Sequence, residues 1–286
     1  MNIPVILSTG SLYHFDIDTV MALAAGAGFA GLELLVDGRR ETYHPAHLEK
    51  LMARHHLPIL AVHSPFATFP PPWPHDPVSR IKQSVHLAEA LGAQTVVVHP
   101  PIRWVRVQGL VLAPQRTWKL SLPLPWAGPG RLGRWLQQEL PAFQAQTRVK
   151  IAVENMPRRQ VGPWQWEPYH FNNAPQLNRF PYLTLDTTHV GTWRKDLLHF
   201  YRQVKPRVAH VHLSNYNGRE HQLLHCGLLP LAALLAELVQ DNFDGLVSLE
   251  LGPISLQADD ETKLKQNLHA SLAFCQQALI SSKLNK

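Results

Sequence analysis

The segment VKIAVENMP at residues 149–157 is an aliphatic run that ends in a carboxylate, Glu154. Three later segments repeat this plan of an aliphatic run followed by a polar side chain: YLTLDTT (182–188, with Asp186), AHVHLS (209–214, with His212) and LVSLEL (246–251, with Glu250). Short, uninterrupted aliphatic runs are typical of parallel strands that are covered on both faces. Because the carboxyl ends of barrel strands open on one face, the four polar side chains predict a shared site at that mouth.

Four further runs of the same kind lie earlier in the chain, and helical stretches alternate with all of them. The eight expected strands are Pro4–Ser8, Gly31–Val36, Pro58–Val62, Thr95–Val98, Val149–Val153, Tyr182–Leu185, Val208–Val211 and Leu246–Leu249. The expected helices are Asp16–Ala27, Pro45–His55, Asp76–Leu91, Leu132–Gln146, Trp193–Val204, Pro230–Gln240 and Asp259–Leu279. This alternation favours a (β/α)₈ TIM barrel over an open doubly wound sheet.

Length and composition agree with one such barrel over residues 1–286. With 45% hydrophobic and 17% charged residues, the chain can bury a full core. Its N-terminus lacks the features of a signal peptide, and no apolar stretch approaches the ~20 residues of a membrane helix. The only cysteines are Cys226 and Cys275. We therefore expect no disulfide framework, no membrane partner and a cytoplasmic location.

The net charge of +6 is compatible with nucleic acid, with an anionic substrate or with no specific partner. Basic residues are scattered apart from four small groups, so we expect a small molecule rather than nucleic acid. Two connections, Pro100–Gly130 and Asn155–Asn173, are long for a compact domain. Both follow strands and are expected to be functional loops on the C-terminal face. Their tryptophans would also suit a homo-oligomer contact.

Three carboxylates and one imidazole suit Mn²⁺, Mg²⁺ or Zn²⁺ better than metals that prefer thiolates. More histidines come at or after strand ends, namely His63, His99, His189 and His221. A single such histidine is more often a packed residue than a ligand, but this repetition predicts a second metal or substrate contacts. His210 is expected to face the layer between barrel and helices and to be structural.

The segments GFAGLEL, VVVHPP, AVENMP, LTLDTTHVG, HVHLS…EHQ and VSLEL occur in this order between Gly28 and Leu251. Together they resemble the xylose-isomerase-like barrel superfamily, which includes sugar-phosphate isomerases and epimerases and endonuclease IV-type nucleases. The resemblance implies one divalent metal held by a quartet of residues, Glu154, Asp186, His212 and Glu250. It also implies that Glu154 and Glu250 transfer the proton of a carbohydrate-like substrate.

The resemblance extends to residues around the quartet. His63 and His99 match the histidines of a first zinc site in the nucleases. Arg219 stands where the nuclease pattern has an aspartate ligand, which argues against three metals. Arg219 is then a candidate contact for an anionic or polar substrate group. Glu33 is either a substrate contact or a buried partner of another polar group.

A metal-dependent sugar, sugar-phosphate or polyol isomerase or epimerase is the favoured interpretation. A lyase or dehydratase, a nuclease for abasic DNA and a non-catalytic metal-binding barrel stay open as alternatives. One departure from the isomerase pattern falls at Leu224–Gly227, where a proline and a glycine are missing. The activity of the site depends on how this loop is folded.

Overall fold

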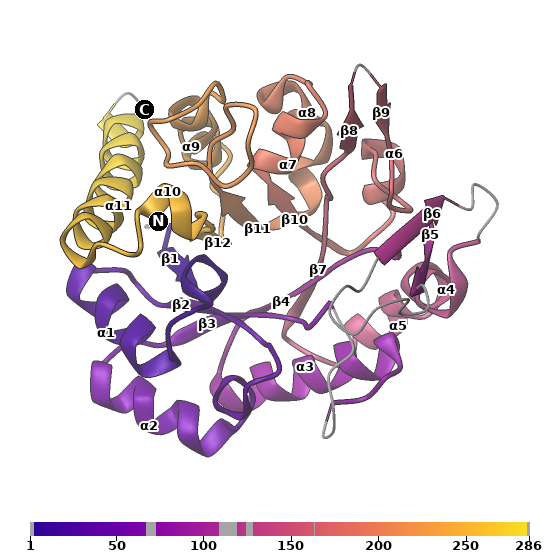
Figure 1. Ribbon diagram of the computed structural model, residues 1–286, viewed down its shortest axis with the longest axis horizontal. Helices are drawn as coiled ribbons and strands as arrows, with labels where there is room; N and C mark the ends of the chain where they lie inside the picture. The colour runs from indigo at the N-terminus through magenta and orange to yellow at the C-terminus, as the bar shows by residue number, and fades with distance from the viewer. Residues whose placement is uncertain (1–2, 67–72, 109–118, 124–127, 163, 285–286) are drawn as a thin grey trace, which may run out of the picture.

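Eight parallel strands close into a barrel in the computed structural model, which describes residues 3–66, 73–108, 119–123, 128–162 and 164–284 (Figure 1). Around the barrel the strands follow the order β1-β12-β11-β10-β7-β4-β3-β2. Their bounds are β1 Val5–Ser8, β2 Leu32–Leu35, β3 Ile59–His63, β4 Thr95–Val98, β7 Lys150–Glu154, β10 Tyr182–Asp186, β11 Val208–Leu213 and β12 Leu246–Leu249. The predicted (β/α)₈ TIM barrel is thereby confirmed.

Each barrel strand is flanked by two neighbours and covered on both faces, which explains its aliphatic composition. All six residues of β11 are buried, as are all four of β12. The strands β3, β7 and β10 continue to His63, Glu154 and Asp186, so these polar side chains occupy the last strand position. These three polar groups, together with His212 in β11, are therefore anchored on the sheet, whereas Glu250 and His99 directly follow their strands.

Helices cover the outside of the barrel. Four of the seven expected helices lie within one residue of their expected bounds, and the last runs to Leu284 instead of Leu279. The observed helices are α1 Ile17–Ala27, α2 Pro45–His55, α3 Pro77–Leu91, α4 Gly130–Gln138, α5 Leu140–Gln144, α6 Ala174–Leu177, α7 Thr187–Thr192, α8 Leu197–Val204, α9 Leu231–Gln240, α10 Pro253–Leu256 and α11 Glu261–Leu284, with 3₁₀ turns η1 Thr9–Leu12, η2 Arg40–Thr42 and η3 Lys205–Arg207. Asp16 and Asp76 cap α1 and α3 by accepting hydrogen bonds from backbone N–H groups of the first turn. No helix within the described ranges is long and apolar enough to cross a membrane.

Two other expected helices differ from the structure in where they break or begin. The stretch expected as Leu132–Gln146 is divided into α4 and α5, because Pro141 has no N–H to continue the hydrogen bonding of α4. The stretch expected to begin at Trp193 begins at Leu197 instead. Asp196 caps α8 there, and Trp193 ends the preceding helix α7. In both cases a local backbone preference outweighed the apolar periodicity.

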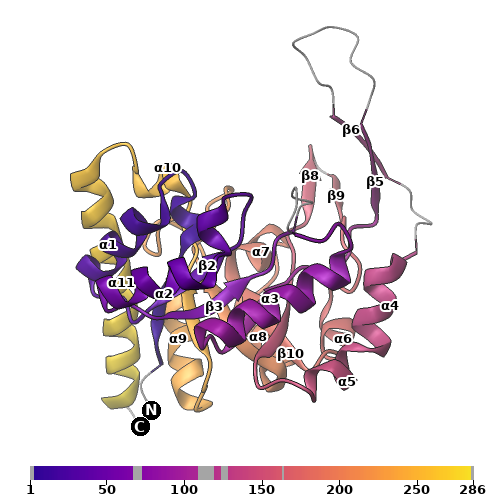
Figure 2. The same cartoon turned by 90° about the horizontal axis from the view of Figure 1, so that it is seen from below.

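The two long connections contain antiparallel hairpins. After β4 the hairpin is formed by β5 Trp104–Gln108 and β6 Lys119–Pro123, and after β7 by β8 Arg159–Val161 and β9 Trp164–Trp166. Residues 109–118, 124–127 and 163 of these connections lie outside the described residues. The Arg103 N–H donates to the Pro168 carbonyl at 2.8 Å, which joins the two connections at their bases. Both hairpins project from the face opposite the chain termini (Figure 2).

Gly245, just before β12, permits a close approach of two backbones. A Cβ atom at this position would lie 2.1 Å from the Ala209 carbonyl oxygen at the start of β11. We predict that Gly245→Ala lowers the free energy of unfolding by about 1–3 kcal/mol, because backbone must shift to relieve the clash. Urea denaturation measures this. Gly26→Ala is the control, since a Cβ there meets nothing within 4 Å; equal stability of both variants would contradict the packing argument.

Candidate metal site at the mouth of the barrel

The quartet comes together at the C-terminal end of the barrel. One ligating atom from each of its four residues lies within 4.8 Å of every other. Glu154 and Asp186 end adjacent strands β7 and β10, and Asp186 is the register partner of His212 on β11. Three of the side chains are buried, whereas Glu250 is 23% exposed and faces the mouth. Barrel closure is what brings these four groups together.

The His212 imidazole is the centre of the quartet. Its Nδ1 lies 3.0 Å from Glu154 Oε1, 2.9 Å from Glu250 Oε2 and 3.8 Å from Asp186 Oδ2. Burial disfavours the charged imidazole, but the surrounding carboxylates outweigh this and raise the pKa of His212 well above its usual value. Burial also opposes ionisation of Glu250, yet the facing imidazole lowers the pKa of Glu250 to about 2.

The negative charge of the neighbouring carboxylates acts most strongly on Asp186. Burial, together with the charges of Glu154 and Glu250, raises its pKa well above the usual range. Its Oδ1 accepts a hydrogen bond from the His189 N–H at 2.8 Å, but the buried Oδ2 has no hydrogen-bond partner. A buried carboxylate oxygen without a partner, beside two other carboxylates, is what a divalent cation would satisfy. The quartet therefore fits such an ion.

His63 and His99 approach the second carboxylate oxygen of Glu154, the one that does not face His212. Their Nε2 atoms lie 3.7 and 2.9 Å from Glu154 Oε2, and these groups could together hold an ion. His63 Nδ1 lies 3.0 Å from the Ser64 carbonyl oxygen and must donate its proton there. In the neutral ring the Nε2 lone pair then faces the glutamate. Such an arrangement needs a proton or a metal between them, which makes this a candidate second ion site.

His189 and His221 lie at the edge of the site. Both direct Nδ1 at a carbonyl oxygen, of Asn155 at 2.8 Å and of Glu250 at 3.1 Å respectively, so Nε2 is the free acceptor in each neutral ring. Burial lowers the pKa of His189 to about 4. Neither belongs to a candidate group of three metal ligands in the described chain. Their Nε2 atoms therefore remain as acceptors at the edge of the quartet.

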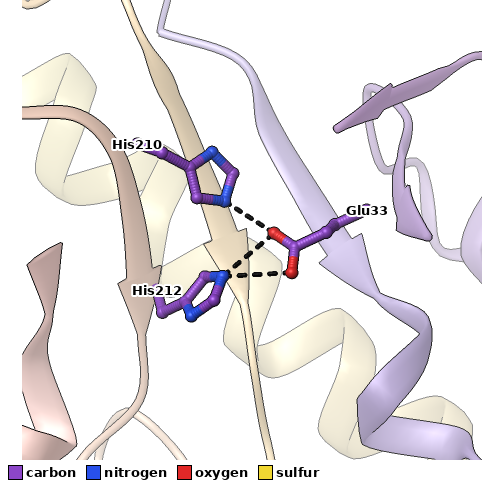
Figure 3. A group of neighbouring side chains, drawn as sticks. All are labelled: Glu33, His210 and His212. Carbon is purple, nitrogen blue, oxygen red and sulfur yellow. Dashed lines mark hydrogen bonds and ion pairs between the residues drawn. The ribbon is translucent and has the colours of Figure 1, made fainter. Parts of the chain in front are cut away.

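Glu33 lies behind the quartet and has no exposed surface. It accepts hydrogen bonds from His212 Nε2 at 3.0 and 3.1 Å and from His210 Nε2 at 2.6 Å (Figure 3). Both carboxylate oxygens are therefore used inside the barrel, which favours the buried partner over the substrate contact. Glu33 holds the Nε2–H tautomer of His212 and so directs Nδ1 at the other carboxylates.

The expected position of His210 is wrong. Its side chain is fully buried in the barrel interior and points at Glu33, on the same side as His212 (Figure 3). Residues two apart in a strand share a face, so the pair His210 and His212 could have indicated this arrangement. Asn155 was also missed, although it follows Glu154 directly. Its Oδ1 accepts from the Asp186 N–H and its Nδ2 donates to the Asp186 carbonyl.

The structure does not bring Arg219 into the quartet. This residue is exposed, and its backbone N–H donates to Asn217 Oδ1 at 3.3 Å. The segment Leu224–Gly227, which departs from the isomerase sequence pattern, is held by Asn215. The Asn215 Nδ2 donates to the Leu224 carbonyl at 2.7 Å. An ordered loop thus replaces the missing proline and glycine, and His225 and Cys226 within it are exposed.

A cleft of about 790 Å³ opens beside the quartet. His99 lines it and also faces Glu154 with Nε2, so one side chain borders both the cleft and the metal site. Other lining residues include Phe66, Arg80 and Arg159, from the β3–α3 connection, α3 and β8. The mouth of the barrel therefore has a buried acidic centre and a wider, partly basic flank.

The chain belongs to the xylose isomerase-like TIM barrel family, whose sequence model matches residues 21–272. The resemblance noted in the sequence is thereby confirmed. Uncharacterised proteins of Mycobacterium bovis and Mycobacterium leprae are each 29% identical, over 96% and 92% of this chain and 97% and 94% of their own lengths.

Similar solved structures include a D-tagatose 3-epimerase-like protein, with 18% identity, a TM-score of 0.71 and 99% of each chain covered. Another is 3-keto-D-glucoside 4-epimerase from E. coli, with 16% identity, a TM-score of 0.67, and 96% of this chain and 100% of that one covered. A D-psicose 3-epimerase has 15% identity, a TM-score of 0.67, and coverage of 97% and 99%. At these identities the likeness shows the fold.

The protonation of the site predicts how metal affinity depends on pH. The pKa values of Asp186 and His212 are raised, so both groups hold protons that a cation must displace. Affinity for Mn²⁺ should therefore rise as the pH increases from 5 to 8, with net release of protons. Calorimetric titration in two buffers of different ionisation enthalpy measures that release. Identical heats in both buffers would contradict it.

Glu33 provides a second prediction for this site. In Glu33→Gln the amide can no longer accept from both imidazoles, so His212 is free to place a proton on Nδ1. Affinity for Mn²⁺ should fall about 10- to 100-fold, as for other partners of metal-binding histidines. Calorimetry measures the affinity, and ¹⁵N NMR of the imidazoles reports the tautomer. Glu41→Gln, which alters an acid paired with Arg39 away from the quartet, is the control; an unchanged affinity in Glu33→Gln would refute this role.

Proposed function

We propose that this protein is a divalent-metal-dependent isomerase or epimerase of a sugar or polyol derivative. The observation that carries the proposal is that two carboxylates, those of Glu154 and Glu250, lie 3.0 and 2.9 Å from the same atom, His212 Nδ1. Glu154 comes from β7 and Glu250 follows β12, so the two approach the mouth from different sides of the barrel. The family and the sugar epimerases among the similar structures support the same class of reaction.

The quartet would hold the ion, and Mn²⁺, Mg²⁺ and Zn²⁺ all accept this set of oxygen and nitrogen ligands. Such an ion polarises a substrate carbonyl and stabilises negative charge on its oxygen. His63 and His99 could hold a second ion with Glu154. This arrangement leaves a one-metal and a two-metal form of the site as alternatives that metal analysis of the purified protein separates.

The two glutamates would perform the proton transfer. Facing groups keep the pKa of Glu154 well below its usual range and that of Glu250 at about 2, against the effect of burial, so each is ionised and able to accept a proton. One carboxylate removes the proton from the carbon beside the carbonyl. For epimerisation the other carboxylate would first take a proton from solvent and return it to the opposite face, and the first would then release its proton to solvent. For isomerisation the first carboxylate would itself return the proton to the neighbouring carbon.

Water exclusion and orientation would come from the surroundings. His189 and His221 have Nε2 atoms free to accept hydrogen bonds from substrate hydroxyls. The hairpin β8–β9 and the base of the β5–β6 connection lie on the mouth side, where barrel enzymes build their pockets (Figure 2). The substrate would therefore be held between the quartet and these connections.

Exchange of a substrate C–H proton with deuterated solvent tests the proposal. Ketoses incubated with the Mn²⁺-loaded protein should incorporate deuterium, as seen by NMR, and Glu154→Gln or Glu250→Gln should slow this at least about 100-fold, since each removes a proton-transfer group. Glu220→Gln, in the loop after β11, is the control. The assignment fails if both quartet variants keep the exchange rate of the unaltered protein.

Phosphodiester cleavage is a second candidate, favoured by the cluster of His63 and His99 on Glu154. Arg219 opposes it, because a cation stands where the nuclease pattern has a third-metal ligand. Cleavage of abasic DNA by the Zn²⁺-loaded protein, with binding that weakens steeply as salt is added, would favour the nuclease over the isomerase.

A further inference from the structure

Arg80 is a buried arginine without an acidic partner in the described part of the chain. It lies in the first turn of α3, lines the cleft beside His99 and is only 7% exposed. Its Nη1 donates to the carbonyl oxygens of His75 at 2.7 Å and Pro74 at 3.4 Å. Its buried Nε has no hydrogen-bond partner. In the described part of the chain no carboxylate lies within ion-pair distance of this guanidinium.

Asp76 is the acid nearest in sequence, but its oxygens are already used. They accept hydrogen bonds from Ser79 N and Oγ at the start of α3, and Oδ1 pairs with Arg131 Nη1 at 3.2 Å. Burial lowers the pKa of Arg80, and Asp76 only partly opposes this effect. Buried guanidinium groups normally face a carboxylate or another anion, because an unpaired buried charge is costly. The missing partner of Arg80 would therefore come from outside the chain.

The rest of the cleft has the same sign of charge. Arg131 and Arg159 also line it, and none of the described lining residues is acidic. Arg159 has no ion pair in the described chain. His99 separates the cleft from Glu154, and the volume of the cleft lies in the range of about 300–1,000 Å³ that is usual for small-molecule sites. A ligand in the cleft would therefore lie beside the arginines and be one side chain away from the acidic centre.

We propose that this cleft is a subsite for an anionic group, a phosphate or a carboxylate, on a substrate whose carbons react at the quartet. The proposal rests on the proposed isomerase or epimerase function. Arg80 would bind the anion through the part of its guanidinium that lines the cleft, since this group presents parallel donors to phosphate and carboxylate oxygens. The epimerases among the similar structures are named for uncharged sugars. The substrate of this protein would differ from theirs in carrying the charge.

Inorganic phosphate and the metal-free protein provide a test that does not depend on turnover. Titration calorimetry should detect phosphate binding, and Arg80→Met should weaken it about 10- to 100-fold, while Arg80→Lys should weaken it less. Arg54→Met is the matched control, because Arg54 pairs with Asp18 on the outer surface. Equal phosphate affinity in Arg80→Met and the unaltered protein would overturn the subsite.

A second pair of variants keeps the test decisive if Arg80→Met does not fold. Ile102 lines the cleft, is 45% exposed and makes no polar contact with Arg80. Ile102→Glu should weaken phosphate binding at least about fivefold by repulsion, whereas Ile102→Gln should leave it unchanged. The same affinity in both variants would place the phosphate elsewhere and refute the proposal.

Competition then separates the two sources of charge. Fructose 6-phosphate should displace the bound inorganic phosphate if the substrate group is a phosphate ester, and fructuronate should do so if the group is a carboxylate. In either case uncharged fructose should not displace the phosphate. Competition by fructose equal to that of both anions would overturn the proposal. Arg80-dependent phosphate binding without any C–H exchange would refute the proposed function alone, and exchange of uncharged ketoses without such binding would refute the subsite alone.

Discussion

The charge balance around the His212 imidazole governs the arrangement of the barrel mouth. Four carboxylates, those of Glu33, Glu154, Asp186 and Glu250, converge where burial makes an uncompensated charge costly. The His212 ring contacts three of these carboxylates, with Nε2 directed at Glu33 and Nδ1 at Glu154 and Glu250. The remaining repulsion falls on Asp186, which retains an unpartnered oxygen. Such a concentration of buried carboxylates fits a divalent cation.

Glu154 links this centre to the rest of the mouth. One of its oxygens faces His212 and the other faces His63 and His99. His99 in turn borders the cleft, so the acidic centre and the basic flank meet at one side chain. The two regions have opposite charge, which is the electrostatic arrangement expected for a ligand with a reactive uncharged part and a distant anionic part. The barrel supplies the first region and the connections after its strands supply the second.

The fold was predictable because its signals are local and repeated. Each expected barrel strand is present within one or two residues, and the aspartate caps at Asp16 and Asp76 begin helices where the sequence places them. The misses also have local causes. Pro141 divides a helix that apolar periodicity alone would continue, and the hairpins β5–β6 and β8–β9 lie in segments whose composition is irregular. Pairing across a hairpin depends on partners that periodicity does not reveal.

The sequence by itself determined the barrel, the quartet and the histidines around it, because strand ends in a parallel barrel must open on one face. The tertiary structure decided which neighbours these groups have. Of the two alternatives for Glu33 it favoured the buried partner, here of His210 and His212. It also left Arg219 exposed and placed Arg80 without a carboxylate beside the cleft. Strand spacing specifies which face a side chain occupies. Only barrel closure and helix packing specify which charged side chains contact one another, and the chemistry of the site depends on those contacts.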